Sequence, residues 1–233
     1  MPQKYPFVLD GKKLGGYLIH VGNVSRGRFI EETNFELYLK TIDGETSENP
    51  MVKGKYFSGR GKLYKPWLDI YYYNLVKFKS KIENISEGGL GEKLFKHLSD
   101  LLPPGSHIMV VYVDHEETRK GLERGIPAPA TPIGYLLWKS GFTWFKDWYF
   151  AEGGLEGDVK LQGNKPLKDE DKQKNLLEIY KVLEEFLKKE KSEDKLFARA
   201  REKAKKVIAS IKKFTAIPKK QARYNRYFTI SLS

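Results

Sequence analysis

The feature that most constrains this fold is a near-continuous apolar run, HIMVVYV, at residues 107–113. A strand that is apolar at successive positions is buried on both faces of a sheet, so helices must cover that sheet. The preceding segment Gly91–Leu102 places its leucines and a phenylalanine on one helical face, and Pro103-Pro104-Gly105 ends it. Trp67–Tyr73 (WLDIYYY) predicts a second strand from its aromatic and β-branched content. The sequence therefore predicts an α/β chain of the α+β type.

The remaining pattern of the first two thirds predicts a β-rich start and short helices afterwards. Thr131 is the expected N-cap of one helix, with Pro132 in its first turn and Gly141 after its end. Met51–Tyr64 is rich in Gly and Lys and is expected to be a loop or a weak hairpin. The other expected elements are strands at Gly16–Val21 and Asn34–Ile42, helices at Thr118–Arg124 and Thr131–Lys139, a linker at Ile126–Ala130, and one or two strands in Phe142–Phe150.

The last third is predicted to be helical. Asp171–Lys191 carries apolar side chains at heptad-like spacing, and Ser192 is the expected N-cap of a second amphipathic helix. Two such helices predict an antiparallel hairpin packed on the sheet domain, and the alternating tail Phe228–Ser233 predicts a final edge strand. We expect a domain at residues 1–165 and a basic helical hairpin with a C-terminal strand at 166–233.

Composition excludes several classes of chemistry. The 233 residues include no Cys, which removes disulfides, thiolate nucleophiles and Cys-type zinc sites. No apolar run approaches the ~20 residues that span a bilayer, and the first residues lack an apolar signal region, so a cytoplasmic protein with no membrane partner is expected. Charged residues make up 31% of the chain, with Lys dominant. This pattern is typical of proteins from heat-loving organisms.

The charge is unevenly distributed. The net charge is +12, of which +11 lies from Lys160 onward. One interpretation is a solvated Lys/Glu-rich helical face; the other is a nucleic-acid-binding surface in which cations contact phosphates and Tyr224 and Tyr227 stack on bases. The cations of that surface would be Arg199, Lys203, Lys206, Arg223 and Arg226.

The segment Ser86–Leu94 (SEGGLGEKL) is the main candidate for ligand chemistry. Its glycines permit a tight turn, and the start of the following helix offers unpaired N–H groups to an anion such as a pyrophosphate. A Walker loop is excluded because Glu92 follows Gly91 where Lys is required, and a Rossmann loop lacks its third Gly, since Leu94 stands there. A plain turn with an N-cap is the alternative.

Residues 67–150 resemble the GNAT acetyltransferase superfamily in the order strand, Gly-x-Gly loop opening a helix, buried strand, helix, and "GF" leading into strands. The resemblance implies a mixed twisted sheet flanked by helices and an acyl-CoA-binding protein, with acetyl-CoA or another acyl-CoA and no metal. Its pantetheine arm would lie between Tyr71–Tyr73 and Val111–Val113. The implied contacts to acyl-CoA are Ser86, Gly88, Gly89, Leu90, Gly91, Tyr73 and Val113.

The same resemblance implies an N-acyltransferase acting on a small-molecule or protein amine. Leu137 stands where many members carry the Tyr that protonates the leaving thiolate, so Tyr135 is the candidate acid. Glu116, Glu117 and Glu152 are the candidate bases.

A homodimer is left open, and a non-catalytic protein that binds nucleic acid through its basic C-terminal helices is the alternative function. A methyltransferase that uses S-adenosylmethionine ranks last, because the acidic Gly-rich motif before LLPPGSHIMVVYV is missing.

Two further clusters carry alternative interpretations. His115, in the acidic turn after the buried strand, would be a general base, or else part of an exposed helix start. The aromatic run from Phe142 to Phe150 would stack on a base, or else form core.

The segment Pro103–Gly163, with PPGSHIMVVYV, TPIGYLLWKSGFTWFKDWYF and EGGLEGDVKLQG, is also similar to a family of uncharacterised archaeal and bacterial proteins, which implies a shared fold and no known activity.

Overall fold

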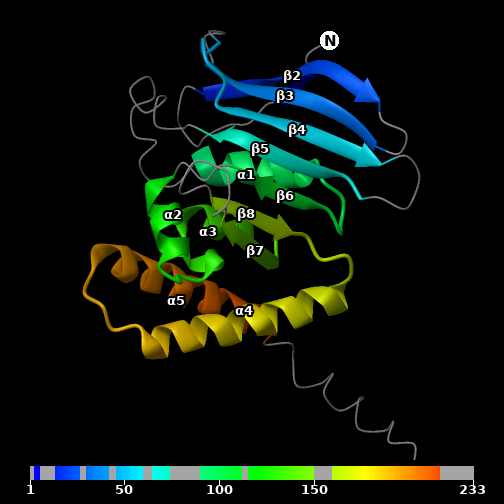
Figure 1. The fold of residues 1–233 in the computed structure, drawn as a ribbon. Coiled ribbons are helices and arrows are strands. Elements are labelled where there is room, and N and C mark those ends of the chain that lie inside the picture. The colour runs from blue at the N-terminus through cyan, green and yellow to red at the C-terminus, as the bar shows by residue number, and fades with distance from the viewer. Residues whose placement is uncertain are drawn as a thin grey trace, which may run out of the picture.

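A computed structural model describes residues 3–5, 14–26, 30–41, 46–59, 65–73, 90–111, 115–149 and 159–215. They form an eight-stranded mixed sheet in the order β1-β2-β3-β4-β5-β6-β8-β7, and the helices gather beside and beneath its second half (Figure 1). The expected α+β class is confirmed. The strands are β1 Gln3–Tyr5, β2 Leu14–Arg26, β3 Ile30–Thr41, β4 Val52–Gly59, β5 Trp67–Tyr73, β6 His107–Val110, β7 Trp144–Tyr149 and β8 Val159–Asn164. The helices are α1 Leu90–Asp100, α2 Glu116–Glu123, the 3₁₀ turn η2 Ala128–Ala130, α3 Pro132–Lys139, α4 Asp169–Lys189 and α5 Lys195–Thr215.

The first five strands form an antiparallel meander. The expectation of a loop or weak hairpin at Met51–Tyr64 was wrong, because Val52–Gly59 is the regular strand β4. Lys53 and Lys55, which suggested a loop, instead form cross-strand ion pairs with glutamates of β3, and such pairs stabilise a sheet. Gly54 is required where it stands, because a Cβ atom there would lie 2.3 Å from the carbonyl oxygen of Asp69.

The second half of the sheet is built around β6. This strand pairs in parallel with β5 and antiparallel with β8, so it has a neighbour on each side. The predicted burial on both faces is only partly confirmed, because Ile108 and Val110 are buried whereas His107 and Met109 are half-buried. The described strand ends at Val110, and residues 112 and 113 of the predicted strand lie outside the described residues. Strand β8 was not predicted, because its polar alternate positions (VKLQGN) hide a regular pattern of buried and half-buried residues.

The first hydrophobic cluster lies between the sheet and helices α1 and α3. Leu68, Ile70, Ile108 and Val110 are buried in the sheet. They share one cluster with Leu94, Phe95 and Leu98 of α1 and Leu137 of α3. The predicted start of α3 is confirmed, since the Thr131 side chain accepts a hydrogen bond from the Gly134 amide.

The second cluster joins the helical hairpin α4–α5 to η2. The predicted apolar stripe of α5, from Phe197 to Ile211, is buried here. On α4 the buried positions are Leu176, Ile179, Leu183 and Phe186, while Tyr180 and Leu187 are only partly buried at the edge of the cluster. Ser192 is not the N-cap of α5: the Asp194 carboxylate accepts from the Leu196 amide, and the Ser192 hydroxyl accepts from the Asp194 amide just outside the helix.

Candidate functional site

The only parallel pair in the described sheet, β5 and β6, is paired over part of its length. The register runs from Trp67–His107 to Ile70–Val110, and the Val111 amide adds one bond to the Ile70 carbonyl at 2.8 Å. Strand β5 continues to Tyr73 and there pairs with β4 alone among the described residues. Tyr71 is an extra residue in that pairing, since Ile70 lies opposite Gly54 and Tyr72 opposite Lys53. Such a β-bulge re-aims a strand, and here it lies just past the last described pair between β5 and β6.

Asp69 is a desolvated carboxylate on β5, just before this point. Its neighbours Leu68 and Ile70 are buried under α1, so Asp69 faces the opposite side of the sheet. The Oδ1 atom is buried and has no hydrogen-bond partner in the described residues. Burial raises the pKa of Asp69 to about 6, although Lys160 and Lys55 oppose this rise. A half-buried carboxyl with a pKa near neutrality can take up and release protons.

A hollow lies next to Lys55, the β4 residue opposite Asp69 in register, although Asp69 itself does not line it. It has a volume of about 490 Å³ and is lined by Asn34, Phe35, Glu36, Lys53, Gly54, Lys55 and Tyr71. Lys55 lies opposite Asp69 in register and places its ammonium 5.8 Å from the Tyr71 ring centroid. Its ion pair with Glu32 spans 2.6 Å, and Lys53 and Glu36 are 2.9 Å apart. The hollow therefore offers charges of both signs around an aromatic ring.

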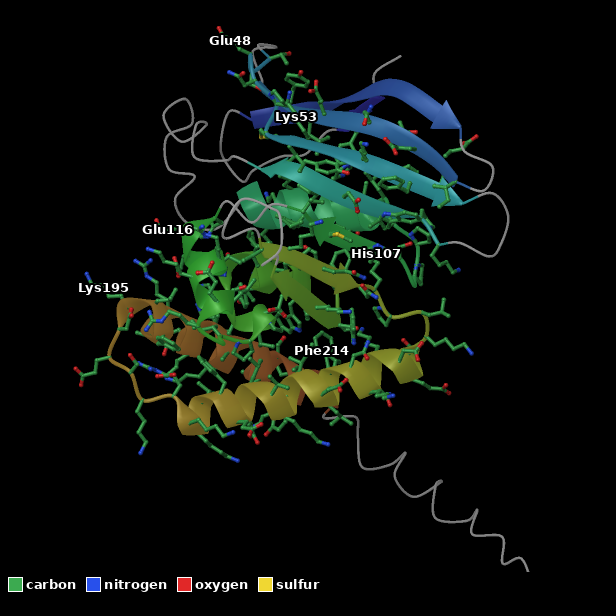
Figure 2. The ribbon with its side chains drawn as sticks, viewed as in Figure 1. Glu48, Lys53, His107, Glu116, Lys195 and Phe214 are labelled. Carbon is green, nitrogen blue, oxygen red and sulfur yellow. The ribbon has the colours of Figure 1, made fainter. Side chains whose placement is uncertain are left out.

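The ends of the elements show which edge of the sheet this is. In Figure 2, Lys53 and Glu116 lie towards one end of the strands and His107, the first residue of β6, towards the other. Glu116 begins α2, which follows β6, so the Lys53 end is where β5 and β6 finish. The carboxyl ends of parallel strands are where α/β sheets place ligands.

Helix α1 begins at Leu90, as the predicted phosphate-binding segment requires. Its first-turn amides, including that of Gly91, have no partner within the helix. Glu92 in the same turn pairs with Lys139 at 2.5 Å, which offsets its negative charge. Tyr73 ends β5 beside the candidate site. Ser86, Gly88, Gly89 and Val113 lie outside the described residues, so their predicted roles stay predictions.

The structure does not place the predicted catalytic groups Tyr135 and Glu116 beside Asp69. Tyr135 packs with Trp138 against the second cluster, so it faces the helical hairpin. Leu137 and Ile133 are the buried α3 residues that face the sheet core. Glu116 is exposed and pairs with Lys120 at 2.5 Å, which lowers the pKa of Glu116. Glu152 lies outside the described residues.

His115 acts structurally in this fold. Its Nδ1 accepts from the Thr118 amide at 3.3 Å and so caps α2. The buried Thr118 hydroxyl also contacts Nδ1 and accepts from the Ile133 amide, which joins the start of α2 to α3. Desolvation lowers the pKa of His115, while Glu117 opposes this effect. The interpretation of this turn as a helix start is therefore supported by geometry.

The predicted nucleic-acid surface is partly used inside the protein. Glu117 of α2 contacts Arg199 at 3.1 Å and Lys203 at 3.7 Å. Burial lowers the pKa of Lys203, an effect that Glu117 opposes. Lys206 is exposed and forms no ion pair with a described residue, whereas Arg223 and Arg226 lie outside the described residues. The nucleic-acid hypothesis stays a prediction, with Lys206 as its remaining cation in the described part of α5.

Sequence reasoning missed Asp69, Lys55 and Lys160. One signal was available: Asp is depleted in strands, yet Asp69 stands in the middle of WLDIYYY. Lys55 was assigned to a loop, and Lys160 belongs to the strand that was not predicted. Their convergence depends on strand order, which local sequence patterns do not reveal.

Two further properties concern the described ranges only. No cluster of three or more His, Asp or Glu side chains there has the arrangement needed to hold a metal ion. None of the helices described is both long enough and apolar enough to cross a membrane.

Comparison with known proteins identifies relatives without an assigned activity. A search among curated proteins finds no match. The crystal structure of AQ1966, a protein of unknown function from Aquifex aeolicus VF5, is similar, with a TM-score of 0.62 and 30% sequence identity. The similarity covers 84% of this chain and 89% of that one. Residues 15–190 match the family described as protein of unknown function DUF1122. The chain therefore belongs to the DUF1122 family.

Proposed function

We propose that this protein binds an acyl-CoA along β5, beyond its last described pair with β6, and transfers the acyl group to an amine. The observation that carries the proposal is the parallel ladder, whose described pairs run to Ile70 and Val110, while β5 itself runs on to Tyr73. Among the described residues, no strand pairs with the side of Tyr71–Tyr73 that faces away from β4, and an extended ligand would bind there. A pantetheine arm contains two amides and can hydrogen-bond to a strand edge as an added strand does.

The start of α1 supports a site for the diphosphate of the same ligand. A helix that joins two parallel neighbouring strands brings its N-terminus to the carboxyl end of the first strand. The amides at Leu90 and Gly91 then offer donors and a positive dipole end to phosphate oxygens. The resemblance to GNAT enzymes assigns the diphosphate to this helix start.

Asp69 is the best candidate for the proton-transfer group. Its carboxylate would accept a proton as the amine nitrogen of the acceptor bonds to the thioester carbonyl carbon. The carbon–sulfur bond then breaks, and the CoA thiolate takes up a proton. With a pKa of about 6, Asp69 is ionised near pH 7 and is a stronger base than an ordinary aspartate. Lys55 and Lys160 limit the rise of this pKa and keep the carboxylate form available.

The first test is binding. Isothermal titration of the full chain with acetyl-CoA and with CoA should show saturable binding below roughly 1 mM, the upper end of usual KM values. Absence of binding at that concentration, with the fold confirmed by circular dichroism, would overturn the proposal.

The second test separates binding from chemistry. Thiol release from acetyl-CoA can be followed with a panel of primary amines, and the chain adds no thiol background because it contains no Cys. Asp69→Asn should keep acetyl-CoA binding and lower the transfer rate by about 10²-fold or more. Glu116→Gln, a control at an exposed carboxylate, should leave the rate unchanged. Equal rates for wild type and Asp69→Asn would remove Asp69 from the mechanism.

The pH profile gives an independent check. The rate constant kcat/KM should rise with pH through about 6, where Asp69 loses its proton, and then level off. The Asp69→Asn variant should lack that rise.

A further inference from the structure

A second hollow lies at the other end of the sheet, between β7, η2 and α4. Its volume is about 330 Å³, within the range of small-molecule sites. Pro127, Ala128 and Pro129 form one side, Phe145 comes from β7, and Ile179, Val182 and Leu183 come from α4. The space exists because η2 carries only small or cyclic side chains opposite the apolar face of α4. The hollow is therefore a mainly apolar site bounded by three elements.

Two carboxylates line this hollow from different walls. Asp147 comes from β7 and Glu178 from α4. Neither forms an ion pair or a side-chain hydrogen bond with any described residue, and no Lys or Arg is among the lining residues. Two of the other polar lining side chains are joined to each other, since the Asn175 amide donates to the Thr143 hydroxyl at 3.2 Å. The carboxylates are thus the groups left to bind a guest.

We infer that this hollow binds an organic cation, namely an ammonium group attached to a compact hydrocarbon body. The hydrocarbon would bury against Phe145, Ile179 and Leu183, and the ammonium would lie between Asp147 and Glu178. The rest of the chain argues against a general attraction for cations, because the protein carries a net charge of +12. Saturable binding of a cation would therefore report a local negative site.

The experiment compares two probes of matched shape. Phenethylamine is a cation near neutral pH, and 2-phenylethanol is its neutral counterpart. Titration of the full chain, followed by amide chemical shifts, should show saturable binding of the amine at residues of β7 and α4. The alcohol should bind about tenfold more weakly, since it lacks two partly exposed ion pairs worth up to ~1 kcal/mol each.

Variants assign the site to the two carboxylates. Asp147→Asn and Glu178→Gln keep the side-chain shape, and each should weaken amine binding about 2–5-fold. The double variant should bind the amine no better than the alcohol. Glu170→Gln, at an exposed carboxylate of α4 outside the hollow, should have no effect. Val182→Phe fills the hollow from its exposed rim and should abolish binding without loss of the fold.

Three results would overturn the inference. Equal binding of amine and alcohol would mean an apolar cavity without charge selection. Unchanged affinity in the folded double variant would place the cation elsewhere. No saturation below roughly 10 mM, about −2.7 kcal/mol, would mean that the hollow has no affinity for this class.

Discussion

Asp69 should reduce the stability of the protein at the pH where it is ionised. Its pKa is raised from 3.8 to about 6, so the folded state holds this proton more tightly than the unfolded state does. The contribution of protonated Asp69 to the unfolding free energy is fully present below pH 3.8 and is lost as the pH rises through about 6. The difference corresponds to about 3 kcal/mol of unfolding free energy, as an upper value. Asp69→Asn removes the charge and keeps an oxygen that can accept the hydrogen bond from Trp67.

The expected result is a variant that is more stable than the wild type at pH 8 and equally stable near pH 4. A gain of up to about 3 kcal/mol corresponds to roughly 6–12 °C in Tm for a chain of this size. Thermal and urea unfolding across this pH range measure it. Glu116→Gln is the opposite control, because Lys120 lowers the pKa of Glu116 from its ordinary value of 4.5, so this variant should be slightly less stable than the wild type above pH 4.5 and equal to it at lower pH. A constant difference between Asp69→Asn and wild type from pH 4 to 8 would refute the desolvation of Asp69.

Three further predictions concern packing and capping, all measured by urea unfolding. Gly54→Ala should destabilise the sheet by about 1–3 kcal/mol, because the added Cβ would lie 2.3 Å from the Asp69 carbonyl oxygen. Its control, Gly121→Ala, should be tolerated, because the Cβ added there would have no contact shorter than 3.4 Å. Leu183→Ala should lower the free energy of unfolding by about 2–5 kcal/mol, because Leu183 is fully buried. Its control, Leu177→Ala, should change that free energy by less than about 0.5 kcal/mol, because the Leu177 side chain is 52% exposed. Thr118→Val should cost about 1–3 kcal/mol, because it leaves the buried Ile133 amide without its acceptor, and an unchanged stability would contradict that role.

Much of the fold was predictable because local patterns specify it. The strand Trp67–Tyr73 has the predicted bounds, and α3 begins with the predicted Thr131 cap. Both rest on short-range physics, namely side-chain preference for a pleated surface and the capping of first-turn amides. The apolar stripe of α5 was predicted for the same reason.

The errors concern long-range pairing. Strand β4 looked like a loop because its lysines find their glutamate partners on another strand. Strand β8 escaped prediction because its alternate positions are polar and only half-buried. The partners of Asp69 come from β4 and β8, so the candidate site depended on these two strands. Tyr135 was chosen because it lies near Leu137 in the sequence; in the structure it faces the helical hairpin, and its predicted catalytic role stays a prediction.

The position of α5 has a practical consequence for how relatives of this protein are handled. The matched family region ends at residue 190, before α5 begins. Helix α5 nevertheless covers the apolar side of α4. The ion pairs Arg124–Asp194 and Arg199–Glu117 also connect α5 and the residue before it to α2 and its C-cap. A fragment cut at the homology boundary would leave Leu176, Ile179, Leu183 and Phe186 facing water. Such a fragment should self-associate during purification, so the limit of sequence similarity is a poor guide to the smallest autonomously folding piece.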